Sequence, residues 1–118
     1  MIKEANVTLM VTDIDRAVHF YVETLGLKLR NRYGNEFAQV TAPGTTIALH
    51  PISDQGPNSA PPERISIGFS VDHLDGVMSE LKAKGVQFSR VTDDKQVRLA
   101  FFNDPDGYAL YLSESKWG

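Results

Sequence analysis

The order of elements in the first half of this chain returns in the second half. An apolar stretch at residues 6–11 precedes a helical run that ends at Gly26, and a stretch at residues 65–71 precedes a second run that ends at Gly85. The offset is roughly 60 residues, which is too long for a solenoid repeat and suits a duplicated supersecondary module. Two such modules can close face to face, so the sequence predicts a site lined by a few inward-facing positions.

Both predicted helices carry an apolar stripe with helical spacing. In the first half, Ile14 begins a stripe with a 3.6-residue period that reaches Leu25, and Asp13 or Thr12 is the predicted N-cap. The second helix is predicted at residues 73–84. Each run is followed by a glycine, which is typical of a helix C-terminus.

Three short strands are predicted after each helix. The predicted strands are residues 6–11, 27–33, 37–41 and 46–50 in the first half, and 65–71, 86–91, 97–102 and 108–112 in the second. Residues 51–63 contain four prolines and one glycine and read as a linker. Each half is therefore βαβββ, and the predicted class is α+β. The predicted organisation is a first module at residues 1–50 and a second at residues 64–118.

Composition excludes several classes of function. With a net charge of −3 the chain lacks the basic face that binding to nucleic acid requires. There is no cysteine, which excludes disulfides, thiolate metal sites and cysteine nucleophiles. No apolar run is long enough to span a membrane, and no leader segment is evident. We therefore expect a cytoplasmic protein with no nucleic-acid or membrane partner.

Two motifs resemble one known superfamily. The first is Phe20-Tyr21 followed by Leu25-Gly26, and the second is the run from Phe101 to Gly107, which contains Asp-Pro-Asp-Gly. In this order and distance they resemble the vicinal oxygen chelate superfamily of glyoxalases, bleomycin-resistance proteins and extradiol dioxygenases. The resemblance implies that the modules pair into an open half-barrel with outer helices, that the ligand lies inside, and that the protein is a homodimer. It does not imply one reaction.

The resemblance also locates the four positions at which enzymes of this superfamily bind a divalent metal. They fall on Asn6, Ala48, Ser66 and Tyr111. An amide and two neutral hydroxyls are weak ligands for transition metals, and alanine provides none, whereas such a site needs about three strong donors. The three histidines lie on separate predicted elements. We therefore predict no metal and no cofactor.

The residues on the free faces of the predicted strands are the candidates for ligand binding. They are Asn6, Thr8, Gln39, His50, Ser66, Gly68, Phe101 and Tyr111. Aromatic rings beside a few hydrogen-bonding groups suit a flat, partly apolar ligand. Alternatively, Phe101 and Tyr111 fill the half-barrel, the small residues Ser66 and Gly68 let a partner sheet pack closely, and His50 is an exposed residue at a strand end.

Two further features allow more than one interpretation. Lys28, Arg30 and Arg32 alternate along one strand, so they share one side and either attract an anion or protect a sheet edge. Trp117 stacks on a ligand, closes the dimer or has no further role. His19 is predicted to be a solvated surface residue and His73 to be structural.

The leading hypothesis is a binding protein of the glyoxalase and bleomycin-resistance type that holds a small organic molecule without metal. The alternative is a lyase, isomerase or transferase of the same superfamily. It requires either a metal site elsewhere or an acid–base pair such as His50 with Tyr111.

Overall fold

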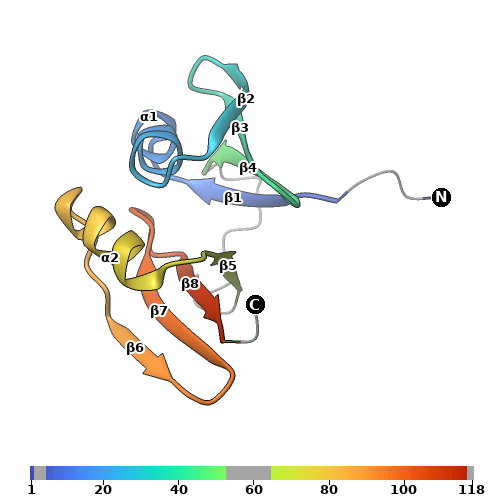
Figure 1. The fold of residues 1–118 in the computed structure, drawn as a ribbon. Helices are drawn as coiled ribbons and strands as arrows, with labels where there is room; N and C mark the ends of the chain where they lie inside the picture. The colour runs from blue at the N-terminus through green and yellow to red at the C-terminus, as the bar shows by residue number, and fades with distance from the viewer. Residues whose placement is uncertain (2–4, 53–64, 117–118) are drawn as a thin grey trace. The chain divides into compact units, whose positions relative to one another are not determined.

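The computed structural model describes residue 1, residues 5–52 and residues 65–116. The chain divides into two compact units, Met1–Ala60 and Pro61–Gly118. Each unit has one four-stranded mixed sheet and one helical segment in the order βαβββ (Figure 1). The predicted α+β class with two βαβββ modules is therefore confirmed. The linker predicted at residues 51–63 lies almost wholly outside the described residues, so its bounds stay a prediction.

The sheet of the first unit has the strand order β1-β4-β3-β2. Its elements are β1 (Val7–Val11), α1 (Ile14–Val18), η1 (His19–Thr24), β2 (Lys28–Tyr33), β3 (Phe37–Ala42) and β4 (Thr45–Pro51). Strand β1 is parallel to β4, and the other neighbours are antiparallel. Alternate residues of the strands are buried and form the core with α1: Leu9, Val11, Ala38, Val40, Ile47 and Leu49. Ala48, between the last two, is buried as well.

The first helix is α-helical only in its first half, and the prediction of one α-helix over residues 14–25 was wrong in this respect. It begins as expected, because Asp13 Oδ1 accepts a hydrogen bond from the Arg16 N–H at 3.1 Å. From His19 it continues as a π-helix, in which the Leu25 N–H donates to the Phe20 carbonyl five residues earlier. Leu25, which follows the π-helix, is half-buried, whereas Tyr21 is fully buried.

The second unit repeats this topology with the strand order β5-β8-β7-β6. Its elements are β5 (Ser66–Ser70), α2 (Leu74–Ala83), β6 (Arg90–Asp93), β7 (Val97–Asn103) and β8 (Ala109–Ser115). Strand β5 is parallel to β8, and the remaining pairs are antiparallel. In both units the last strand along the chain therefore lies inside the sheet.

Strand β6 begins four residues later than the prediction of residues 86–91. The Val86 N–H donates to the Leu81 carbonyl, and the Gly85 N–H donates to the Lys82 carbonyl, each at 3.0 Å. These two bonds form the Schellman motif that ends α2. Gly85 takes the positive φ of 97° that this motif needs. Val86 is thus the end of a helix, and its backbone is not available to the sheet.

The turn between β7 and β8 is organised by the buried side chain of Asp104. Its Oδ1 accepts hydrogen bonds from the backbone N–H groups of Asp106 and Tyr108, both at 2.9 Å. Gly107 follows with a φ of 91°. The Asp-Pro-Asp-Gly motif therefore has a structural role here: one carboxylate satisfies the backbone of a tight turn.

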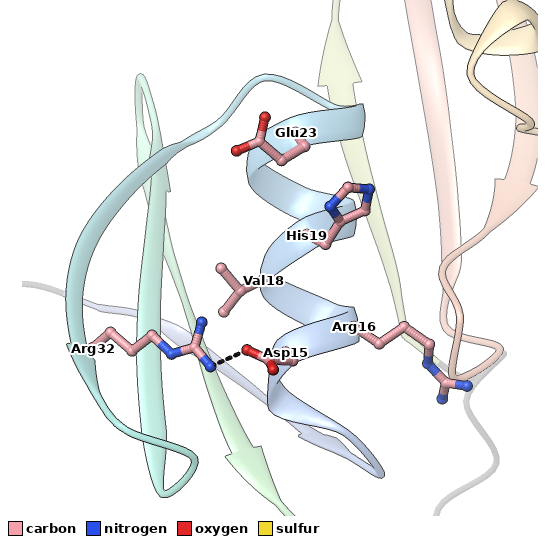
Figure 2. A pocket seen from close by; sticks show the side chains of 6 residues that line it. All are labelled: Asp15, Arg16, Val18, His19, Glu23 and Arg32. Carbon is pink, nitrogen blue, oxygen red and sulfur yellow. Dashed lines mark hydrogen bonds and ion pairs between the residues drawn. The ribbon is translucent and has the colours of Figure 1, made fainter.

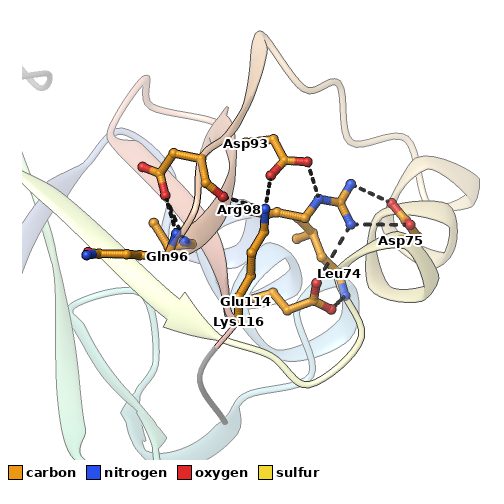
Figure 3. Close-up of polar contacts among 9 residues, drawn as sticks. Leu74, Asp75, Asp93, Gln96, Arg98, Glu114 and Lys116 are labelled. Atoms are coloured by element: carbon orange, nitrogen blue, oxygen red, sulfur yellow. Dashed lines mark hydrogen bonds and ion pairs between the residues drawn. The ribbon is translucent and has the colours of Figure 1, made fainter.

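A polar network joins α2 to the sheet of the second unit (Figure 3). His73 is the N-cap of α2 but makes no side-chain cap, and Glu114 of β8 takes over this role by accepting the Leu74 N–H at 2.9 Å. Arg98 of β7 donates to both oxygens of Asp75 in the first turn of α2. It also forms ion pairs with Asp93 and Glu114 at 3.6 and 3.7 Å.

This network predicts a loss of stability in acid. Hydrogen bonds from Arg98, together with its charge, hold the pKa of Asp75 below its ordinary value of 3.8. The folded state thus binds the proton of Asp75 less tightly than the unfolded state does. The contribution of this ion pair to the free energy of unfolding is therefore present above the ordinary pKa of Asp75 and is lost as the pH falls through its lowered pKa in the folded state. We expect the urea midpoint of an Arg98→Met variant to lie below that of the unchanged protein at pH 7. Below about pH 4 the difference should shrink.

The exposed cation Lys95, in the turn between β6 and β7, provides the control. A Lys95→Met variant should differ from the unchanged protein by a small amount that depends little on pH. Equal effects of Arg98→Met at pH 7 and pH 3 would contradict this role of the network.

Candidate functional site

The sheet of the second unit has one face toward α2 and one face without a helix. Residues with even numbers on β7 and β8 lie toward α2. Arg98 and Glu114 contact the first turn of this helix, and the other even-numbered residues in the middle of the two strands are buried. The buried ones are Ala100, Phe102, Leu110 and Leu112. The alternate residues therefore stand on the other side, which we call the open face of this unit.

Four residues form a row across the open face, one from each strand. Gly68, Tyr111, Phe101 and Arg90 are direct neighbours across β5, β8, β7 and β6. The ring centroids of Phe101 and Tyr111 are 6.0 Å apart, and Arg90 Cζ lies 4.5 Å from the centroid of Phe101. We call these four residues the aromatic row.

Gly68 has a specific role in the aromatic row. A Cβ atom placed there would lie 2.2 Å from Cζ of Tyr111, which is far inside contact distance. The Tyr111 ring therefore lies directly on the backbone of β5, and only glycine leaves room for it. The small residue accommodates a ring from its own sheet, which differs from both predicted roles, contact with a ligand and close packing of a partner sheet.

A hollow of about 380 Å³ adjoins one end of the aromatic row. It is lined by Ser89, Arg90, Phe101, Phe102, Asn103, Ala109 and Leu110. Two of the polar groups are engaged, because Asn103 Nδ2 donates to the Gly107 carbonyl and Ser89 Oγ donates to that of Phe101. The lining thus combines two phenylalanines, aliphatic surface and one guanidinium, and contains no carboxylate. Such a lining suits a small organic molecule.

The equivalent row of the first unit consists of three polar residues and one alanine. Thr8, Ala48, Gln39 and Asn31 are the corresponding neighbours across β1, β4, β3 and β2. Asn31 Nδ2 donates to Gln39 Oε1 at 2.9 Å, so the two amides bind each other. The two modules therefore share a topology but present different chemistry on their open faces.

The eight residues predicted to bind a ligand fall into two groups. Thr8 and Gln39 lie in the row of the first unit, Asn6 is exposed just before β1, and His50 is exposed near the end of β4. Ser66, Gly68, Phe101 and Tyr111 all lie on the open face of the second unit. The predicted site thus corresponds to positions on two separate sheets.

The structure fixes the tautomer of His50. Its Nδ1 lies 2.8 Å from the carbonyl oxygen of Pro51, which can only accept. Nδ1 therefore carries a hydrogen, and a neutral His50 presents Nε2 as an acceptor. The side chain is exposed, and it makes one local contact with its own strand end.

Arg90 was missed as a candidate. The expected strand at residues 86–91 included it, but its cross-strand partner depends on where β6 begins and on the length of the turn after it. The alternation of Arg90 with Val91 indicates that the two side chains lie on opposite faces of the sheet. Only the register of β6 against β7 shows that Arg90 lies beside Phe101.

The prediction that Lys28, Arg30 and Arg32 share one side of their strand was wrong. The register of β2 against β3 shifts between Leu29 and Asn31, which is a β-bulge. Lys28 then pairs with Thr41 on the open face, whereas Arg32 pairs with the buried Ala38 on the helix side. Arg32 accordingly forms an ion pair with Asp15 of α1.

A second hollow of about 570 Å³ lies on this helix side of the first unit (Figure 2). It is lined by Asp15, Arg16, Val18, His19, Glu23 and Arg32. The donors of Arg32 are engaged by Asp15, by Asn35 and by the Gly34 carbonyl. Arg32 is thus neutralised within the protein, and its ion pair with Asp15 connects β2 to α1.

The donor set for a metal is poor at the positions that the superfamily would use. Among residues 5–52 and 65–116, no three histidine, aspartate or glutamate side chains gather closely enough to hold an ion. Tyr111 is packed on Gly68, Ala48 has no donor, and the acid of β8, Glu114, caps α2 on the opposite face. These residues do not fit a catalytic metal. Trp117 lies outside the described residues.

The comparisons with known proteins agree with the two modules and their motifs. Residues 5–112 match the family model of the Glyoxalase/Bleomycin resistance protein/Dioxygenase superfamily. The chain belongs to this superfamily. The resemblance drawn from the Phe20-Tyr21 and Asp-Pro-Asp-Gly motifs is thereby confirmed.

Solved structures of the superfamily include an antibiotic-binding protein. This is TnmS3 from Streptomyces sp. CB03234, which is 27% identical, has a TM-score of 0.77, and is matched over 98% of this chain and 100% of its own. A glyoxalase/bleomycin resistance protein from the same source is 25% identical with a TM-score of 0.71, over 93% of this chain and 100% of its own.

Similar curated proteins include lyases that are much longer than this chain. The lactoylglutathione lyase of Schizosaccharomyces pombe is 28% identical over 90% of this chain but only 46% of its own length. A probable chloroplastic lactoylglutathione lyase of Arabidopsis thaliana is 31% identical over 92% of this chain and 35% of its own length. The chain thus spans less than half of either lyase.

None of the helices within the described residues has the length and apolar character needed to cross a membrane.

Proposed function

We propose that this protein binds a small, planar organic molecule at the aromatic row and the hollow beside it, without a metal. The observation that carries the proposal is the ring pair of Tyr111 and Phe101 at the edge of a hollow without carboxylates. Rings on an exposed sheet face contribute to binding through stacking and apolar contact, which do not require a catalytic group. The similarity to an antibiotic-binding protein supports binding over turnover.

A neutral aromatic probe tests this proposal. Naphthalene-2-carboxamide has roughly 13 heavy atoms, and at about 0.3 kcal/mol per atom its expected Kd is about 1 mM. Heteronuclear NMR detects binding in this range and locates it. We expect the amide shifts to concentrate at Gly68, Phe101, Tyr111 and the turn after β7.

Three variants sharpen this test. Phe101→Ala should weaken binding about tenfold, which corresponds to about 1.4 kcal/mol of lost stacking and apolar contact. Gly68→Ala should weaken it as well, because the new methyl group displaces the Tyr111 ring. Tyr33→Ala removes an exposed ring from the first unit and should have no effect. No binding, or shifts confined to the first unit, would refute the proposal.

The metal content of the purified protein gives a separate prediction. Because the four superfamily positions provide an amide, a methyl and two hydroxyls, we expect far less than one Zn, Mn, Ni or Fe per chain in protein purified without a metal-binding tag. Thermal melting should shift by less than about 2 °C with these ions. A stoichiometric metal would instead favour the alternative function, a lyase, isomerase or transferase, which the similarity to lactoylglutathione lyases supports.

A further inference from the structure

The guanidinium of Arg90 is the feature of the hollow that its aromatic lining does not explain. Within the described residues, the exposed Arg90 takes part in no ion pair, in common with Arg30, whereas Arg32 and Arg98 are neutralised by carboxylates. The guanidinium of Arg90 lies over the Phe101 ring at the hollow. An unneutralised cation beside an apolar hollow attracts a negative group from outside the protein.

The position of Arg90 is defined by the sheet. Its backbone pairs with Phe101, and its Cζ lies 4.5 Å from the centroid of that ring. Cation–π contact places the guanidinium over the ring, and a guanidinium can donate to two oxygens of one carboxylate. In the first unit the corresponding residue is Asn31, which is neutral and bonded to Gln39. A charge at this position of the row is therefore present in the second module and absent from the first.

We propose that Arg90 makes this site selective for planar aromatic anions, with the aromatic body in the hollow against Phe101 and its carboxylate on the guanidinium. This inference rests on the proposed function and adds the class of ligand. Lysine at this position would keep the charge but lose the planar fork that binds a carboxylate through two hydrogen bonds.

Two probes of the same shape test the inference. Naphthalene-2-carboxylate and naphthalene-2-carboxamide differ only in charge at one group, and NMR titration gives a Kd for each. We expect the carboxylate to bind about tenfold more tightly, as a charge-assisted pair of hydrogen bonds would give. The preference should decrease as the salt concentration rises.

Variants assign this preference to one residue. Arg90→Gln should weaken binding of the carboxylate more than binding of the carboxamide, so that the tenfold preference between the two probes is lost. Arg90→Lys should retain part of the preference. Lys95→Gln, which removes the same charge from an exposed turn of the same unit, should retain all of it.

The two proposals can fail separately. If the carboxamide binds at the aromatic row but the carboxylate is not preferred, or if Arg90→Gln keeps the preference, the inference about Arg90 is wrong and the proposed function stands. If neither probe binds there, both are wrong.

Discussion

Replacing Phe102 with alanine is expected to lower the free energy of unfolding of the second unit by about 3–5 kcal/mol. Phe102 is only 2% exposed, lies on the helix side of β7, and packs edge-on against Phe88 at a centroid distance of 5.4 Å. The substitution removes a whole ring and leaves a cavity that strands paired on both sides cannot close. The total free energy of unfolding of a small protein domain is only about 5–15 kcal/mol. Chemical denaturation with urea measures the change.

The neighbouring Phe101 provides the matched control for this prediction. It has the same side chain on the same strand but lies half-exposed on the open face. Phe101→Ala should lower stability by about 1 kcal/mol or less while weakening ligand binding. Equal losses of stability in the two variants would mean that the open face is part of a buried core.

Replacing Asp104 with alanine is expected to have the second largest effect, a loss of about 3 kcal/mol. The Asp104 carboxylate is 5% exposed and accepts the N–H groups of Asp106 and Tyr108. Without it two donors in a part-buried turn lose their partner, and each such loss costs about 1–3 kcal/mol. Urea denaturation and the amide exchange rates at residues 106 and 108 report this effect.

Asparagine at the same position separates the hydrogen bonds from the charge. Asp104→Asn keeps a side-chain oxygen where Oδ1 lies and should recover most of the lost stability. It should also leave probe binding unchanged, since Asp104 does not line the hollow. Loss of binding with intact stability would instead show that this motif residue takes part in ligand recognition.

The fold could be predicted to a large extent because alternation and helix ends are local signals. Gly26 and Gly85 ended their helices as expected, and the strands of both units were located with one clear error. That error concerns Val86. A β-branched residue favours a strand, but the Val86 N–H already donates to the Leu81 carbonyl at the end of α2. The π-helix at His19 has no side-chain pattern of its own, so residue spacing could not reveal it.

The candidate site could be predicted in part. The open-face positions of Gly68, Phe101 and Tyr111 followed from alternation alone. Arg90 did not, because its contact with Phe101 depends on the register between two strands. The error for Arg32 has the same origin, since one bulge residue reverses every side chain after it. The alternation of residues along one strand predicts which face of the sheet a side chain lies on. Its neighbours depend on the register between two strands, which alternation does not determine.

The place of β8 between β5 and β7 has a consequence for synthesis of the protein in the cell. Residues 66–103 leave the ribosome before β8, and of their strands only β6 and β7 pair with each other. Strand β5 has no partner until β8 emerges, and α2 lacks its cap from Glu114 until the same moment. The second module therefore cannot complete its sheet gradually during translation. It completes its sheet only when β8 emerges, whereas the chain up to Pro51 already contains every strand of the first module.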